Sequence, residues 1–273
     1  MSGQSHLFDK AGRTDSAEVL EELEVDYTPV AVAVQLLLTL ERDLTPAPRI
    51  LMPACGSGCW ARAARAIFPG CHIVGVEPRE SERTNVAAAC DEAFVGTLAE
   101  YIATASGKGS GFDLVADNPP FSAFTDLFWP GLLLDAGLIA PGGRVAFYGL
   151  SQWGQSADAA AHLRRWSPSW QARMGGRVEH RGRGTQSPRP IPKRLQVPGG
   201  PTHEMRNNGA DAREYSFWGW DIEDLNLRRT RPWWHTEQLP ELPTALRQWS
   251  PAAVPGTYPI DPALVDEIRR RYL

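Results

Sequence analysis

The sequence is short of cysteine, of long apolar runs and of segments that direct a chain to a membrane. Its four cysteines form no CxxC pair, which argues against a zinc site and against a disulfide framework. These cysteines are Cys55, Cys59, Cys71 and Cys90. The most apolar stretch, VAVAVQLLLTL, is too short to cross a bilayer and contains Gln35, and the polar start of the chain has no signal-peptide pattern. We therefore expect a soluble, cytoplasmic protein with reduced thiols and no bound metal.

A strong excess of charge of either sign is also absent. The formal net charge of the 273 residues is −4, so the overall charge does not indicate a nucleic-acid partner, and only a local basic patch could do so. Hydrophobic residues make up 42% of the chain, which is enough for one sizeable core with an appendage. We expect residues 1–25 to be a loose N-terminal segment and residues 26–165 to form the core.

Apolar runs that are typical of buried strands alternate with stretches that favour helices. The strands are expected at 49–52, 72–77, 92–96, 112–116 and 143–150. Short links between strands and helices indicate an α/β fold with a doubly wound, mostly parallel sheet that is covered on both faces. The first helix is expected at 29–42, with Thr28 as its N-cap and Pro29 at its first position.

The composition changes after residue 165. Residues 166–210 are rich in Gly, Pro and Arg, which favours a small irregular insertion of loops and short strands. Alternating aromatic residues at 213–222 predict a strand that returns to the sheet as an antiparallel edge, whereas 227–243 has no regular pattern. Residues 211–273 should therefore hold this edge strand and a C-terminal extension, which includes a short helix capped by Asp261.

The stretch PACGSG, residues 53–58, is the first candidate site. Pro53 ends a predicted strand, and the glycines allow close approach of the backbone to a ligand just before a helix whose N-terminal N–H groups are unpaired. A ligand-binding crevice is expected here, at the carboxyl end of a strand in a doubly wound sheet. A tight turn without a ligand would use the same glycines, so the motif alone leaves both interpretations open. Ala61 stands where a dinucleotide GxGxxG pattern would have its third glycine.

Glu77 ends the next predicted strand, about 20 residues past the glycine turn. A carboxylate at this place can accept hydrogen bonds from both hydroxyls of a ribose. A solvated loop acid is the alternative, but the glycine turn before it favours a ligand with a ribose and an adenosine.

The third candidate is NPPF, residues 118–121, at the end of the fourth predicted strand. Asn118 offers a carbonyl oxygen that can accept from an exocyclic amine. Pro119 and Pro120 stiffen the backbone and direct a second carbonyl, and Phe121 offers a ring on which a planar group can stack. Two acceptors around one amine would aim its lone pair at an electrophile without a charged base. The alternative is a turn that is strained and has no chemical role.

These motifs carry a family resemblance. PACGSG resembles the cofactor motif of class I S-adenosylmethionine-dependent methyltransferases, and DNPPF resembles the (D/N/S)PP(Y/F) catalytic motif of amino-methyltransferases. DYTPVAVAVQLLLTL resembles the YTP element and helix of adenine-N6 DNA methyltransferases, and GADAREYSFWGWD is similar to a late strand of small phage-type enzymes of that group. The resemblance covers residues 26–150 well and 210–221 loosely.

The resemblance implies a seven-stranded, Rossmann-like methyltransferase fold, S-adenosylmethionine as cofactor, and transfer of a methyl group to the N6 amine of adenine in DNA. Double-stranded DNA would be the partner, in the cytoplasm of a bacterium or of a phage-infected host, and the adenine would have to leave the base stack. RNA bases, a protein glutamine amide, or binding without catalysis stay open, as does the oligomeric state. The implied catalytic residues are Asn118, Pro119, Pro120 and Phe121. The implied cofactor residues are Tyr27, Thr28, Pro29, Pro53, Ala54, Cys55, Gly56, Gly58, Glu77, Pro78, Thr97 and Asn118.

The chain departs from the family pattern at two cofactor positions. Met52 stands where the family usually has an acid, so one polar contact to the cofactor would be missing. Gly96 and Thr97 replace the usual Gly-Asp pair at the end of the third strand, which bears on the contact with the adenine ring.

A basic segment follows the catalytic motif. Residues 164–206 contain ten Lys and Arg residues against two Glu, a local net charge of about +8. Arg residues among Gly and Pro are suited to phosphate contacts, although many charged runs are only solvated loops. The family carries its target-recognition region at this place. The expected nucleic-acid contacts are Arg173, Arg177, Arg181, Arg183, Arg189, Lys193 and Arg194.

Overall fold

The computed structural model describes residues 28–105, 111–120, 128–155, 157–176, 178, 186–190, 203–207, 214–223, 234–247 and 260–273. The expected loose segment 1–25 and most of the basic segment lie outside these residues. Among the described residues, no helix combines the length and the apolar character that crossing a membrane requires.

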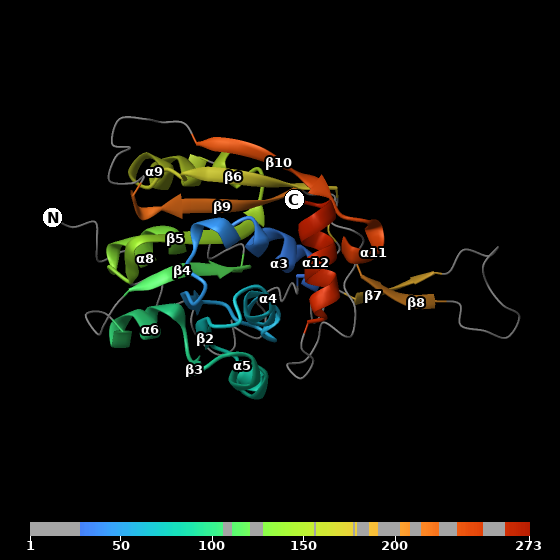
Figure 1. The fold of residues 1–273 in the computed structure, drawn as a ribbon, viewed down its shortest axis with the longest axis horizontal. Coiled ribbons are helices and arrows are strands. Elements are labelled where there is room, and N and C mark those ends of the chain that lie inside the picture. Colours follow the sequence, from blue (N-terminus) through green and yellow to red (C-terminus); the bar gives the residue numbers. More distant parts are fainter. Residues whose placement is uncertain are drawn as a thin grey trace, which may run out of the picture.

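The centre of the fold is an eight-stranded sheet in the order β10-β6-β9-β5-β4-β1-β2-β3 (Figure 1). β9 runs antiparallel to both of its neighbours, and the other pairs are parallel. The predicted mostly parallel α/β sheet is therefore confirmed, with eight strands in place of seven. The strands are β1 (Arg49–Met52), β2 (His72–Glu77), β3 (Glu92–Val95), β4 (Phe112–Asp117), β5 (Ile139–Leu150), β6 (Trp170–Gly175), β9 (Tyr215–Asp221) and β10 (His235–Glu241).

Three expectations about the later strands are wrong. β9 is antiparallel, as expected, but it lies inside the sheet between β5 and β6 and is not an edge. The edge is β10, within 227–243, which has no regular sequence pattern because Leu239 is its one buried residue. An exposed edge strand needs no apolar alternation, and it tolerates Pro240, where the register with β6 shifts. β6 belongs to the main sheet although it falls within the expected insertion 166–210.

Helices cover both faces of the sheet, and each face has its own buried apolar cluster. One face is covered by α3 (Val30–Leu38), α4 (Cys59–Ile67), α5 (Arg83–Ala89), α11 (Thr244–Arg247) and α12 (Pro262–Arg271). The other face is covered by α6 (Leu98–Ala105), α8 (Trp129–Asp135) and α9 (Ala157–Arg165). Short 3-10 turns lie at Glu41–Asp43, Glu80–Glu82 and Trp153–Gln155. A separate antiparallel hairpin, β7 (Gln186–Pro190) with β8 (His203–Asn207), extends from one end (Figure 1).

The two predicted helix starts have different outcomes. Asp261 caps α12, as predicted, since its side chain accepts a hydrogen bond from the Ala263 N–H at 2.9 Å. At α3 the N-cap is Pro29 and not Thr28, and Thr28 makes no capping bond. The Pro29 carbonyl accepts the first helical bond, from Ala33 N at 3.2 Å, so α3 begins one residue later than predicted and the Thr28 side chain is available for other contacts.

Candidate functional site

The glycine turn joins β1 to α4 at the carboxyl edge of the sheet. Gly56 and Gly58 have φ of 54° and 80°, in the left-handed region that favours glycine. The Gly58 N–H donates to the Cys55 carbonyl at 2.8 Å, and the Cys55 N–H donates to the Val76 carbonyl at 3.0 Å. β1 lies between β2 and β4, where the strand order reverses, so the turn borders the crevice in which ligands of such sheets bind.

The Glu77 side chain forms a hydrogen bond with this turn. Its side chain is buried, and its Oε2 accepts from the Gly56 N–H at 2.8 Å. Its Oε1 accepts from the backbone N–H of Arg79 at 3.1 Å and forms an ion pair with the Arg79 Nε at 2.5 Å. The acid singled out at the end of β2 therefore lies beside the glycine turn, 21 positions away in the chain, and Arg79 compensates its charge.

Thr28 and Asn118 meet at the carboxyl end of β4. Asn118 Nδ2 donates to Thr28 Oγ1 at 3.1 Å, and the indole N–H of Trp60 in α4 donates to the same oxygen at 3.2 Å. A hydroxyl oxygen can accept two hydrogen bonds, so Thr28 ties the candidate catalytic amide to the helix that follows the glycine turn. Pro119 is buried and Pro120 is partly buried. Phe121 and Tyr27 lie outside the described residues.

Asp117 is the site residue that the sequence did not single out. Its side chain is only 1% exposed. Its Oδ2 accepts from the Ala54 N–H at 2.9 Å, and its Oδ1 accepts from the Asn118 N–H at 2.9 Å. The pKa of Asp117 is raised to about 7, chiefly because burial disfavours the charged form; the two N–H bonds oppose this rise, and the Glu77 charge adds to it. The one available signal was an acid directly before NPPF, which lies just past the strand predicted at 112–116 and was given no role of its own.

The structure shows what surrounds Met52 and Thr97, the two residues that depart from the family pattern. Met52 is fully buried and packs in the apolar cluster beneath α3 and α4. Thr97 caps α6: its hydroxyl accepts from the Glu100 N–H at 3.2 Å, and the Glu100 carboxylate accepts from the Thr97 N–H at 2.8 Å. Pro78 is partly exposed beside Glu77. The cofactor roles of Thr97 and Pro78 stay predictions.

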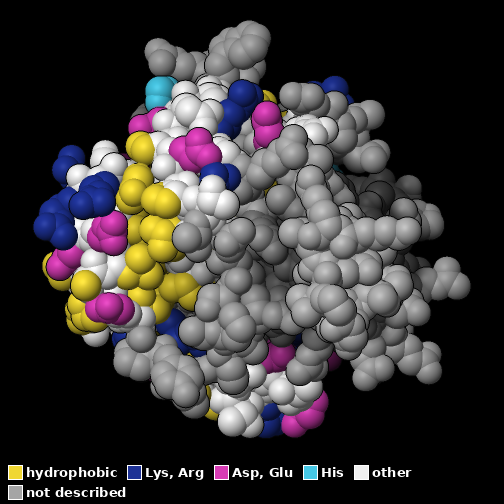
Figure 2. Space-filling view, turned by 90° about the vertical axis from the view of Figure 1, so that its right-hand side faces the viewer, with side chains coloured by type: hydrophobic (Ala, Val, Ile, Leu, Met, Phe, Trp, Pro, Cys, Tyr) yellow, Lys and Arg dark blue, Asp and Glu magenta, His cyan; other side chains and the backbone are white. Residues whose placement is uncertain are grey.

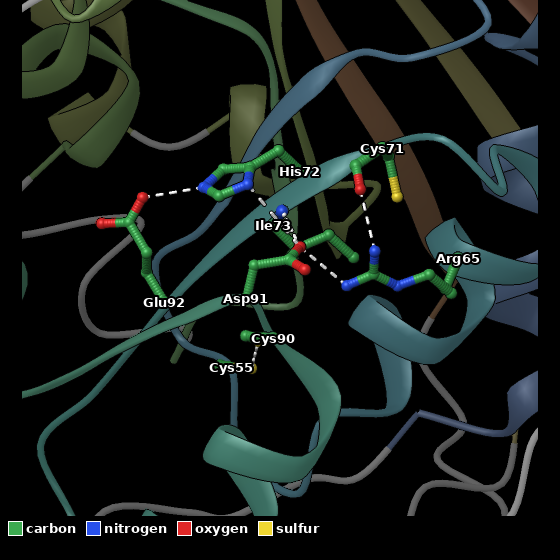
Figure 3. Close-up of polar contacts among 8 residues, drawn as sticks. All are labelled: Cys55, Arg65, Cys71, His72, Ile73, Cys90, Asp91 and Glu92. Carbon is green, nitrogen blue, oxygen red and sulfur yellow. Dashed lines mark hydrogen bonds and ion pairs between the residues drawn. The ribbon is translucent and has the colours of Figure 1, made fainter.

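Figure 3 shows a pair of thiols, Cys55 of the turn and Cys90, and a charged cluster around Asp91. The Cys55 and Cys90 sulfurs are 3.5 Å apart, and this contact together with burial raises the pKa of Cys55, so Cys55 is a protonated thiol. Asp91, which follows Cys90, accepts from the Ile73 N–H and from Arg65, both at 2.8 Å. All four cysteines are free, and within the described residues no cluster of His, Cys, Asp and Glu could hold a metal ion.

The predicted nucleic-acid contacts fall mostly outside the described side chains. Arg173 on β6 is exposed. Arg189 lies on β7, and the others are not described. Figure 2 shows the end of the molecule from which the β7–β8 hairpin extends, and its described side chains include a hydrophobic band, with both basic and acidic groups around it. The described side chains at this end therefore carry charges of both signs. The role of the basic segment in nucleic-acid binding stays a prediction.

No protein-family model matches the chain, and no curated protein matches it. Solved structures similar to it include a modification subunit assigned to a type I restriction enzyme of Vibrio vulnificus (15% identity, 90% of this chain and 52% of that one, TM-score 0.48). A protein of Pyrococcus horikoshii assigned as an RNA methyltransferase is similar at 14% identity over 70% of this chain and 83% of that one (TM-score 0.43). TrmN of Thermus thermophilus is similar at 21% identity over 70% of this chain and 49% of that one (TM-score 0.41). These identities and TM-scores are low, so a function has to be inferred from the chain's own residues.

Proposed function

We propose that this chain is an S-adenosylmethionine-dependent methyltransferase that methylates the N6 amine of adenine in DNA. One observation carries the proposal: hydrogen bonds join three motifs that are far apart in the sequence at one edge of the sheet. Thr28 of the YTP element bonds to Asn118 of NPPF, Ala54 of the glycine turn bonds to Asp117, and Gly56 bonds to Glu77. Neither a strained turn nor a solvated acid would require this convergence.

The residues at the crevice fit the chemistry of this cofactor. Two buried carboxylates, Glu77 and Asp117, border a glycine turn whose backbone can approach a ligand closely. Glu77 would accept from the ribose hydroxyls, and the backbone of Pro53, Cys55 and Gly58 would line the rest of the cofactor site. A ligand that carries both hydroxyl groups and positive charge matches this donor and acceptor set. When bound, S-adenosylmethionine supplies a methyl group on a positively charged sulfur.

Asn118 is the group that we assign to the target amine. Its Nδ2 is held by Thr28, so the planar amide has a fixed direction and its oxygen lies on the side away from Thr28. This oxygen and a carbonyl of the proline pair would accept from the two amine hydrogens and aim the nitrogen lone pair. The nitrogen lone pair would form a bond to the methyl carbon as the bond between that carbon and the sulfonium sulfur breaks; the sulfur would keep the electron pair of that bond, and the amine would lose one proton to solvent. With these two acceptors, the step needs no charged base.

A nucleic acid is favoured over a protein amide because the basic segment follows the catalytic motif, where it would make phosphate contacts. DNA is chosen over RNA on the resemblance to adenine-N6 DNA methyltransferases. The test is mass spectrometry of nucleosides after the purified chain is incubated with S-adenosylmethionine and unmethylated duplex DNA, with RNA in a parallel tube. N6-methyladenine in the DNA tube supports the proposal. Methylated nucleosides only in the RNA tube would contradict the choice of DNA, and none in either tube, with cofactor bound, would contradict nucleic-acid methylation.

A further inference from the structure

The Asp117 carboxylate is buried between the glycine turn and NPPF, and no described cation pairs with it. None of the described Lys, Arg or His side chains forms an ion pair with it, although Glu77 beside it has Arg79. Among the described residues, its titratable neighbours are an acid and two thiols. The charge of Glu77 from β2 acts on Asp117, and the charge of Asp117 acts on Cys55 of the turn and Cys59 of α4. A buried charge of this kind is stable only if it is protonated or is paired by a ligand.

The geometry around Asp117 leaves it able to accept more hydrogen bonds. A carboxylate has about four acceptor positions, and the N–H groups of Ala54 and Asn118 take one on each oxygen. Both donors are backbone groups that hold the carboxylate in place between the glycine turn and NPPF. The matching ligand group is therefore a cation that donates hydrogen bonds. A primary ammonium has three such donors, whereas a sulfonium has none.

We propose that Asp117 binds the α-ammonium group at the amino-acid end of S-adenosylmethionine, an inference that rests on the proposed function. The two carboxylates of the crevice then have separate tasks. Glu77, already neutralised by Arg79, accepts from neutral hydroxyls, and Asp117 receives its counter-charge only from the ligand. The cofactor ammonium would thereby pair with the carboxylate that hydrogen bonds already hold between the turn and the catalytic motif.

This arrangement makes ligand binding depend on pH. In the ligand-free protein the pKa of Asp117 is about 7, because burial disfavours the charged form. Below pH 7 the carboxyl must lose its proton when an ammonium binds, so affinity falls by up to about tenfold for each pH unit. Above pH 7 the carboxyl is already ionised and this dependence ends. A ligand without the ammonium has no such dependence.

The test is calorimetric titration of the wild-type chain and of Asp117→Asn with three ligands. S-adenosylhomocysteine has the ammonium but no sulfonium, S-adenosylmethionine has both, and 5′-methylthioadenosine has neither. We expect Asp117→Asn to weaken the first two by about 10- to 100-fold, the range of a hydrogen bond to a charged group, and to leave 5′-methylthioadenosine unchanged. Glu77→Gln is the matched control, and it should weaken all three ligands.

Each other outcome overturns the inference in a distinct way. Loss of S-adenosylmethionine alone would assign Asp117 to the sulfonium, and equal loss of all three ligands would make Asp117 a support of the turn. Unchanged binding of all three would remove Asp117 from the site while the proposed function stands. If the wild-type chain binds none of the three, both the inference and the proposed cofactor are wrong. The wild-type affinity for S-adenosylhomocysteine between pH 5.5 and 8 gives a check that needs no variant, and a flat profile would contradict the inference.

Discussion

Thr28 and Asn118, 90 positions apart in the chain, are joined by a hydrogen bond of 3.1 Å from the amide nitrogen to the hydroxyl oxygen. The same oxygen accepts from Trp60 in α4, so the amide is held against the helix that follows the glycine turn. The bond determines which end of the Asn118 amide faces the crevice. An acceptor aimed at an amine must keep this direction while the substrate binds.

Thr28→Val tests whether this bond sets the activity. Valine has nearly the shape of threonine but offers no oxygen, so the Asn118 amide loses its fixed direction. We expect kcat to fall by about 10- to 100-fold, because a misplacement of about 1 Å can have an effect of this size, with little change in cofactor affinity. Single-turnover rates and cofactor titration separate the two quantities. Thr28→Ser keeps the oxygen and should keep most of the rate; a Thr28→Ser variant as slow as Thr28→Val would mean that the methyl contact matters.

Asn118→Ala should abolish methyl transfer and change cofactor affinity by no more than a few-fold. The substitution removes the side-chain acceptor for the amine. It keeps the backbone N–H that donates to Asp117 Oδ1, so the crevice retains its carboxylate. Product formation by mass spectrometry and cofactor binding by calorimetry are the two measurements. Turnover by the alanine variant would show that Asn118 is not the acceptor.

Gly58→Ala should destabilise the fold more than the same change at Gly137. Both residues have positive φ, 80° and 65°, so both alanines carry a similar backbone strain of about 1–2 kcal/mol. A Cβ at Gly58 would lie 2.5 Å from the Ala89 Cβ of α5, whereas a Cβ at Gly137 meets nothing within 4 Å. The clash adds about 1–3 kcal/mol of overpacking. Urea unfolding of the two variants measures the difference, and equal losses would mean that α5 moves away at little energetic cost.

Local patterns predicted most of the sheet, and long-range contacts account for what they missed. β1 and β2 were predicted with their exact ends because both are short apolar runs that stop at a proline or an acid. β10 was missed because its partner, and not its own sequence, makes it a strand. Glu77 and Asn118 could be singled out as candidates because Glu77 ends a predicted strand and Asn118 lies just past one. The role of Asp117 could not, since it depends on burial and on the Ala54 N–H, 63 positions away.

Asp117 should also make the stability of the ligand-free chain depend on pH. Its pKa is about 7 in the folded chain, above the ordinary value of 3.8, because burial disfavours the ionised form. The favourable contribution of the protonated carboxyl is complete below pH 3.8 and is lost as the pH rises toward and through 7. Each pH unit between the two pKa values corresponds to about 1.4 kcal/mol. The unfolding free energy of Asp117→Asn minus that of wild type should therefore increase by roughly 4 kcal/mol between pH 4 and pH 7.5. Urea unfolding at a series of pH values measures this gain.

Asp91→Asn is the control with the opposite sign. Burial raises the pKa of Asp91, but the Ile73 N–H and Arg65 lower it more, so the folded pKa lies below 3.8 (Figure 3). Its stabilising contribution is present above pH 3.8 and is lost as the pH falls through the lower pKa, so Asp91→Asn should change the acid limb of the profile and leave the neutral limb as in wild type. The two aspartates therefore act in separate pH windows. If Asp117→Asn leaves the stability profile near neutral pH as in wild type, Asp117 is not buried as a neutral acid. A carboxyl that is already ionised below pH 4 would add no pH dependence at neutral pH for the substitution to remove.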